Sequence, residues 1–98
     1  MYRIIRKVDL RPSLMLLEIE APRVARKAKP GQFIILRVDD EGERIPLTVA
    51  GVNPETGSVK IIFQIVGETT FRLNKKEAGE EISDFVGPLG RATETEKI

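Results

Sequence analysis

Two short segments of the chain carry residues that can bind an anion. In residues 44–48, Arg44 offers a planar fork of five N–H donors that matches a phosphate or a carboxylate. Pro46 cannot donate to a β ladder and marks an edge or bulge where a ligand can approach the backbone, and Thr48 adds a rotatable hydroxyl. Taken alone, this segment is explained equally well as the start of a strand with a surface arginine.

The second segment, residues 67–70, places Gly67 ahead of two hydroxyl residues, Thr69 and Thr70, between an apolar run and an expected helix. The unpaired amides and the dipole at the start of a helix favour a negative charge. An ordinary threonine cap is the better explanation of this segment by itself, because caps are far commoner than phosphate sites. Both segments together, in one small domain, favour a cofactor that carries phosphate.

Strand-forming runs surround these segments. Their alternation of apolar and polar residues, with Gly, Pro, Asn or Asp between them, predicts six strands. The expected strands cover residues 2–10, 14–19, 32–38, 45–51, 58–66 and 81–86. An antiparallel barrel, closed or nearly closed, suits six strands because closure removes the exposed edges of a sheet. The sequence therefore predicts an all-β fold.

One short capping helix is expected at about residues 70–78. It starts with a hydroxyl residue, carries lysines late, and is followed by Gly79, which suits the left-handed position after a helix. We expect residues 1–90 to form one domain. Residues 91–98 are expected to be a polar tail, or a linker to a nucleotide-binding domain that these residues do not include.

The composition excludes several kinds of chemistry. Without cysteine or histidine, the 98 residues offer no disulfide, no cysteine-ligated metal centre, no thiol nucleophile and no imidazole base. We therefore predict no catalytic and no metal-binding residue, and any redox chemistry requires a bound cofactor.

The charge and hydropathy patterns exclude further partners. Sixteen basic and fifteen acidic residues leave a net charge of +1, which disfavours binding to duplex nucleic acid or to an anionic membrane. The basic stretch at residues 23–29 is expected to be a solvated loop, with docking to an acidic partner or a nucleotide as the less favoured alternative. No apolar run approaches the roughly 20 residues of a membrane span and no apolar leader is present, so we expect a cytoplasmic protein.

Four motifs, in their order and spacing, resemble a known family. They are Pro-Gly-Gln-Phe at residues 30–33, Arg-x-Pro-Leu-Thr at 44–48, Val-Gly-x-x-Thr at 66–70 and Gly-Pro-Leu-Gly at 87–90. Together they resemble the FAD-binding domain of the ferredoxin–NADP reductase superfamily. The likeness is greatest to the dihydroorotate dehydrogenase electron-transfer subunit and to the ferredoxin:NADP oxidoreductase (sulfide dehydrogenase) small subunit. The resemblance implies a six-stranded antiparallel Greek-key barrel with one capping helix.

The resemblance also implies a FAD site built from residues of these motifs and of the strand before the helix. They are Arg44, Pro46, Leu47, Thr48, Gln64, Ile65, Val66, Gly67, Thr69, Thr70, Gly87 and Pro88. Residues 46–48 would line the isoalloxazine ring, with Thr48 near flavin N5. Arg44 would reach the diphosphate, assisted by the glycine and threonines at the start of the helix. Residues 64–66 would run beside the ribityl or adenosine part, and residues 87–88 would close the barrel beside the flavin.

Three positions depart from the family pattern. Leu47 stands where many members carry a tyrosine that stacks on the flavin, and Arg44 lies one position earlier than the arginine of the related branch. Glu68 occupies a position where relatives often carry lysine. A carboxylate beside a diphosphate weakens binding unless it points into solvent.

The function implied by the resemblance is electron transfer. The chain would be the flavin-binding domain of an NAD(P)H-dependent oxidoreductase subunit, would act with a partner oxidoreductase subunit, and would not be active alone. Sites for NAD(P)H and a [2Fe-2S] centre are expected only in a full-length relative. The alternative from a different class is a cofactor-free β-barrel module that docks to a partner subunit, for which the basic stretch at residues 23–29 is the motivation.

Overall fold

A computed structural model describes residues 2–90, and the tail of residues 91–98 lies outside the described residues. Within this range, seven strands and two short helices follow one another along the chain. Their bounds are β1 Tyr2–Arg11, β2 Leu14–Glu20, α1 Pro22–Lys27, β3 Phe33–Arg37, β4 Arg44–Asn53, β5 Ser58–Gln64, α2 Glu68–Asn74, β6 Glu81–Ile82 and β7 Asp84–Leu89. No helix among these residues is long and apolar enough to cross a membrane.

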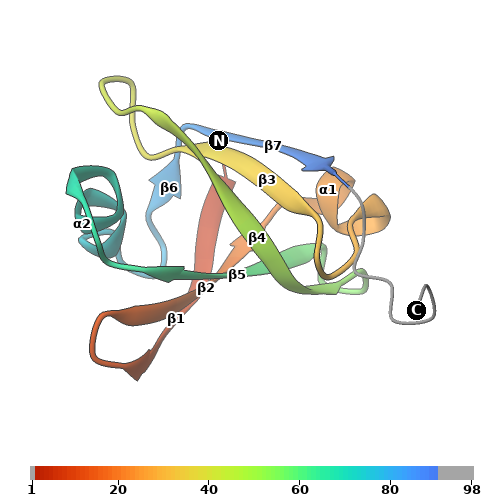
Figure 1. The fold of residues 1–98 in the computed structure, drawn as a ribbon. Coiled ribbons are helices and arrows are strands. Elements are labelled where there is room, and N and C mark those ends of the chain that lie inside the picture. Colours follow the sequence, from red (N-terminus) through yellow and green to blue (C-terminus); the bar gives the residue numbers. More distant parts are fainter. Residues whose placement is uncertain (1, 91–98) are drawn as a thin grey trace, which may run out of the picture.

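The strands form one antiparallel sheet in the order β6-β1-β2-β5-β4-β3-β7, and the sheet curls around a core (Figure 1). The two strands at the ends of this order, β6 and β7, are joined by the single residue Ser83, so the barrel is nearly closed. Strands β3, β4 and β5 follow one another as hairpins, and β2 lies beside β5, which is the Greek-key connection. The predicted all-β Greek-key barrel is confirmed.

The strand count differs from the prediction because residues 81–86 form two strands. The chain pairs with β1 as far as Ile82 and then pairs with β3 from Asp84. The amide of Ser83 donates a hydrogen bond to the carbonyl of Arg37 at 3.0 Å and holds the step between them. One run of strand-forming residues thus pairs with two different strands. The sequence pattern of the run does not show this change of partner.

A second helix, α1, occupies part of the basic stretch that was predicted to be a loop. It begins at Pro22, whose fixed φ suits the first turn of a helix. Val24, Ala25 and Ala28 are buried against the barrel, and the basic residues between them are exposed. This spacing of buried residues is helical, so the prediction of a loop is corrected.

Helix α2 begins two residues earlier and ends four residues earlier than the predicted range of 70–78. The chain after Asn74 is drawn onto β1, where the amide of Gly79 donates to the carbonyl of Ile4 at 2.7 Å. The Nζ of Lys7 on β1 donates to the carbonyls of Asn74, at 2.5 Å, and of Lys76, at 3.0 Å. The bond to Asn74 satisfies a carbonyl at the end of α2 that has no partner within the helix.

The core is filled by apolar side chains from all seven strands and both helices. Its largest fully buried members include Phe85, Ile4, Leu17, Ile34, Leu36, Ile61, Leu73 and Ile82. Leu73 is the one buried residue of α2. It therefore fixes the position of the helix, and with it the position of the segment at residues 67–70.

Ser58 is the one polar residue that is fully buried within residues 2–90. Its hydroxyl donates a hydrogen bond of 2.6 Å to Oε2 of Glu18. This hydrogen bond lowers the pKa of Glu18 below its ordinary value, against the opposing effect of burial and with a contribution from Arg6. The pair makes part of the barrel's stability dependent on pH.

We expect Ser58→Ala to lower the free energy of unfolding at pH 7 by about 1–3 kcal/mol. The pKa of Glu18 is lower in the folded chain, so its contribution is fully present above the unfolded value of about 4.3 and is lost as the pH falls through the folded value. Urea denaturation at neutral and acidic pH should therefore show a smaller effect of Ser58→Ala in acid. In a Glu18→Gln background the effect should not depend on pH, and an effect that grows toward acid would contradict the assignment.

Candidate functional site

The first half of β4 turns its side chains alternately toward and away from the core. Ile45 and Leu47 pack against the core, whereas Arg44, Pro46 and Thr48 are exposed on the outer face. This is the two-residue period of a strand. A ligand on the outer face can therefore meet the side chains of Pro46 and Thr48, but only the backbone of Leu47.

The outer faces of β4, β3 and β7 form one surface, which we call the platform. The strand register sets its residues in two rows, which are Thr48, Phe33 and Leu89, and Pro46, Ile35 and Val86. Val86 is 53% exposed. The platform is thus an accessible apolar surface around the hydroxyl of Thr48, and such surfaces are typical of ligand or partner sites.

Gly87 and Pro88 lie at a bulge in the β7 edge of the platform. The register of β7 on β3 shifts between Phe33 and Ile35, and the peptide bond between Gly87 and Pro88 is cis. A Cβ on Gly87 would lie 2.7 Å from Cγ2 of Ile34. The absence of a side chain therefore lets β7 pack closely on β3, and a proline suits a bulge because it has no N–H to pair.

A groove of about 460 Å³ separates the start of β4 from the start of α2. Its lining residues are Glu41, Glu43, Ile45, Val66, Gly67, Glu68, Thr69, Thr70 and Arg72. The groove exists because β4 and β5 diverge here (Figure 1). The two strands pair from Val49 and Ile61 onward, and no residue of β4 before Val49 pairs with β5. It brings the start of β4 and the segment at residues 67–70 to one place.

The α2 end of the groove presents backbone amides. Among residues 2–90, the amides of Glu68, Thr69 and Thr70 donate no hydrogen bond. The Oγ1 of Thr70 accepts from the amides of Val66, at 2.9 Å, and Gly67, at 3.1 Å, and donates to the carbonyl of Gly67. Thr70 therefore acts as the cap of the turn, while the three amides at the helix start are available to an anion.

Carboxylates give the groove a surplus of negative charge. Glu41, Glu43 and Glu68 line it, against the single cation Arg72. The Nη2 of Arg72 is 2.6 Å from Oδ2 of Asp39, and this hydrogen bond lowers the pKa of Asp39. Within the described residues these carboxylates are not grouped closely enough to hold a metal ion. An anion in the groove therefore has to overcome their repulsion.

Arg44 lies beside the groove without lining it. Its neighbours Glu43 and Ile45 are lining residues, but its own Nη2 is 3.0 Å from Oδ2 of Asp84 on β7. The Nε of Arg37 lies 3.0 Å from the same oxygen. The side chain of Arg44 is 58% exposed, so it stands between the groove and the platform with much of its surface open to solvent.

The three site residues predicted around the end of β5 have different environments in the structure. Gln64 is exposed at the end of β5 and lies outside the groove. Ile65 packs against the core and donates its amide to the carbonyl of Ser13 at 2.9 Å. Only Val66, which is 75% exposed, lines the groove with Gly67.

The sequence prediction does not include several residues of the groove and the platform. They are Glu41, Glu43, Ile45 and Arg72 in the groove, and Phe33, Ile35, Val86 and Leu89 on the platform. Two signals could have found some of them. The period of a strand places Ile45 on the opposite face from Arg44, and the spacing of four residues places Glu68 and Arg72 on one face of a helix.

Comparison with known proteins shows relatives over almost the whole chain, although no family model matches it. A protein of Clostridium beijerinckii, described as an uncharacterized protein in the adh 3′ region, is 51% identical over 94 residues. The dihydroorotate dehydrogenase B (NAD(+)), electron transfer subunit homolog of Thermotoga maritima is 43% identical over 93 residues. These matches cover 96% and 95% of the chain, but 32% and 33% of the relatives. The chain thus spans about a third of the length of these relatives.

Solved structures have the same fold. An NADH-dependent reduced ferredoxin-NADP oxidoreductase, described in connection with flavin-based electron bifurcation, matches 96% of the chain and 34% of its own, with a TM-score of 0.91 and 41% identity. A siderophore-interacting protein of Acinetobacter baumannii, 24% identical, matches 91% of the chain and 39% of its own with a TM-score of 0.70, which shows the fold alone.

The barrel therefore has the fold of the ferredoxin–NADP reductase superfamily. Over most of its residues the chain is homologous to about a third of the length of the dihydroorotate dehydrogenase B electron transfer subunits and their homologs. The resemblance predicted from the four sequence motifs is confirmed.

Proposed function

We propose that the chain is the flavin-binding barrel of an electron-transfer oxidoreductase subunit and that its cofactor is FAD. One observation carries the proposal, which is that the groove and the apolar platform both take residues from the start of β4, Ile45 in the groove and Pro46 on the platform. A planar apolar ring fits the first and a diphosphate fits the second. The 43% identity to the electron transfer subunit homolog of Thermotoga maritima supports it.

The platform is assigned to the isoalloxazine ring. Pro46, the backbone of Leu47, and Gly87 with Pro88 would hold the ring and keep water from one face. The hydroxyl of Thr48 can donate or accept a hydrogen bond near flavin N5. When bound, FAD supplies hydride acceptance and release of single electrons, which no side chain of this sequence can supply.

The groove is assigned to the diphosphate. A Cβ on Gly67 would meet nothing within 4 Å, so the bare backbone leaves room for a phosphate to approach the amides and the hydroxyls of Thr69 and Thr70. Arg44 would bind the diphosphate from the β4 side, with the N–H groups that Asp84 does not occupy. Residues 64–66 would lie along the ribityl or adenosine part, with Val66 in contact.

The remaining functions are proposed for the whole protein. We propose that the barrel acts with a partner oxidoreductase subunit, because relatives are described as electron transfer subunits. Sites for NAD(P)H and a [2Fe-2S] centre would lie in the two thirds of a full-length relative that the chain does not match.

Titration of the purified chain with FAD tests the proposal. We expect saturable binding of one FAD per chain by calorimetry and by flavin fluorescence, and the absorption bands of oxidised flavin on the protein after gel filtration. Riboflavin should bind more weakly because it lacks the diphosphate. Absence of saturable binding at millimolar FAD would contradict the assignment of a cofactor site to this barrel.

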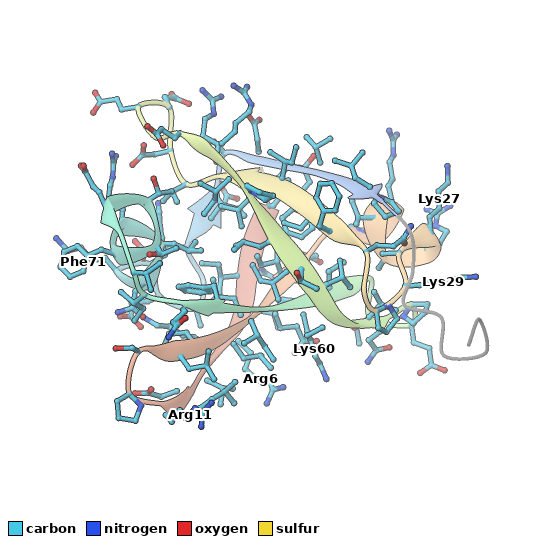
Figure 2. All side chains as sticks on the ribbon, in the orientation of Figure 1. Arg6, Arg11, Lys27, Lys29, Lys60 and Phe71 are labelled. Carbon is cyan, nitrogen blue, oxygen red and sulfur yellow. The ribbon has the colours of Figure 1, made fainter. Side chains whose placement is uncertain are left out.

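A second candidate is a barrel without cofactor that docks to a partner subunit. The observation in its favour is a set of exposed basic side chains on and after α1, which form no ion pair among the described residues and include Lys27 and Lys29 (Figure 2). A colourless protein that co-purifies with a partner subunit would favour this candidate. A yellow protein would favour FAD.

We expect Glu68→Gln to tighten FAD binding about two- to fivefold, because the carboxylate lies in the first turn of α2 beside the proposed diphosphate. Riboflavin affinity should not change, and added salt should reduce the gain for FAD. Calorimetric titrations at two salt concentrations measure both effects. Glu55→Gln, which removes one exposed carboxylate from the turn after β4, is the matched control and should leave FAD affinity unchanged.

A further inference from the structure

Phe71 exposes a large aromatic ring in the middle of α2. Its side chain is 51% exposed, and it points away from the barrel (Figure 2). Val66, one residue before Gly67, is 75% exposed. These are two of the few large apolar side chains exposed among the described residues, and both lie next to the groove. Exposed apolar surface beside a polar groove is typical of a binding site.

The helix places Phe71 at the rim of the groove. With about 100° between successive residues, Phe71 lies about 160° from Leu73 and about 60° from Glu68. Leu73 is buried in the core and Glu68 lines the groove. Phe71 therefore faces away from the core and stands at the outer margin of the groove, adjacent to its lining.

One face of the Phe71 ring is already occupied. The Nζ of Lys75, the residue directly after α2, lies 4.7 Å from the ring centroid. This cation–π contact favours one orientation of the ring. About half of the side chain is exposed, which leaves ring surface for contact with a second planar group.

We propose that Phe71 is a specificity-determining residue that stacks on the adenine base of the cofactor. The inference rests on the proposed function, in which the diphosphate lies in the groove, because the adenosine then continues past the start of α2. Nucleobases stack on aromatic side chains without base-specific hydrogen bonds, because every base has a π-face. FMN and riboflavin have no adenine, so the ring of Phe71 distinguishes FAD from both.

The first experiment compares Phe71→Ala with the matched control Leu10→Ala, which removes a side chain that is 43% exposed on β1. Phe71→Ala should weaken FAD binding about tenfold and leave FMN affinity unchanged, so the ratio of the two affinities falls. Leu10→Ala should change neither. Circular dichroism confirms that each variant is folded, and a merely structural role would change both affinities together.

The second experiment uses Phe71→Trp as a reporter. The chain has no tryptophan, so all indole emission would come from this one position. Saturable quenching by ADP is expected, and none by ribose 5-phosphate, which carries no base.

Two results would overturn the inference. One is an unchanged ratio of FAD to FMN affinity in Phe71→Ala, and the other is no change in the indole emission of Phe71→Trp at millimolar ADP. If the unaltered chain binds no FAD, the proposed function itself fails, and this is recognised before any variant is compared.

Discussion

Leu73→Ala is expected to lower the free energy of unfolding by about 2–5 kcal/mol, the range for a leucine removed from a fully buried position. Leu73 is the one residue of α2 in the core. Its loss therefore removes the main apolar contact that holds the helix on the barrel. FAD binding should weaken as well, because the amides at the start of α2 would lose their fixed position.

Phe71→Ala is the matched control for stability. It shortens a side chain two positions away on the same helix, but one that is half exposed. We expect it to cost less than about 1 kcal/mol. Urea denaturation of both variants at neutral pH gives the comparison. A loss of stability by Phe71→Ala as large as that by Leu73→Ala would show that α2 is held through its outer face.

The barrel was predictable because its strands are encoded locally. In β2, Met15, Leu17 and Ile19 are buried while the residues between them are partly exposed. Such an alternation with a period of two residues predicts a strand from the sequence alone. In β5, four of the seven residues are apolar and favour a strand. Turn residues separate these runs, so both the class of fold and most strand bounds follow from neighbouring residues.

The errors lie where the outcome depends on distant partners. The pattern of residues 81–86 is that of one strand, and only the positions of β1 and β3 require the step at Ser83. The end of α2 is likewise set from β1, through Lys7 and through the bond from Gly79 to Ile4. Helix α1 was missed for another reason, because its basic residues and its proline obscured a short helical spacing of buried residues.

The candidate site divides in the same way. The segment at residues 67–70 is one continuous piece of chain, and its glycine and threonines do line a common groove. The Arg44 side chain is directed toward Asp84, forty residues later, which also pairs with Arg37. Sequence reasoning can place an arginine on a strand, but it cannot choose between a carboxylate partner on another strand and a ligand.

Gly87→Ala is expected to cost about 1–3 kcal/mol or more of unfolding free energy. The added Cβ would lie 2.7 Å from Cγ2 and 3.3 Å from Cα of Ile34, and the second of these atoms belongs to the backbone of the neighbouring strand β3 and cannot rotate away. The strand β7 would have to move off β3. Thermal unfolding and urea denaturation measure the loss.

Gly67→Ala tests a different role of glycine from Gly87→Ala. Gly87 allows two strands to pack closely, whereas Gly67 is proposed to leave room for a ligand. Its backbone is extended, with φ of −163°, and an added Cβ would meet nothing within 4 Å. We expect a stability cost below about 1 kcal/mol, because only the preference at the helix cap changes. FAD binding should nevertheless weaken severalfold, because the new methyl group would occupy the space in front of the α2 amides. Unchanged FAD affinity in a stable Gly67→Ala variant would place the diphosphate elsewhere.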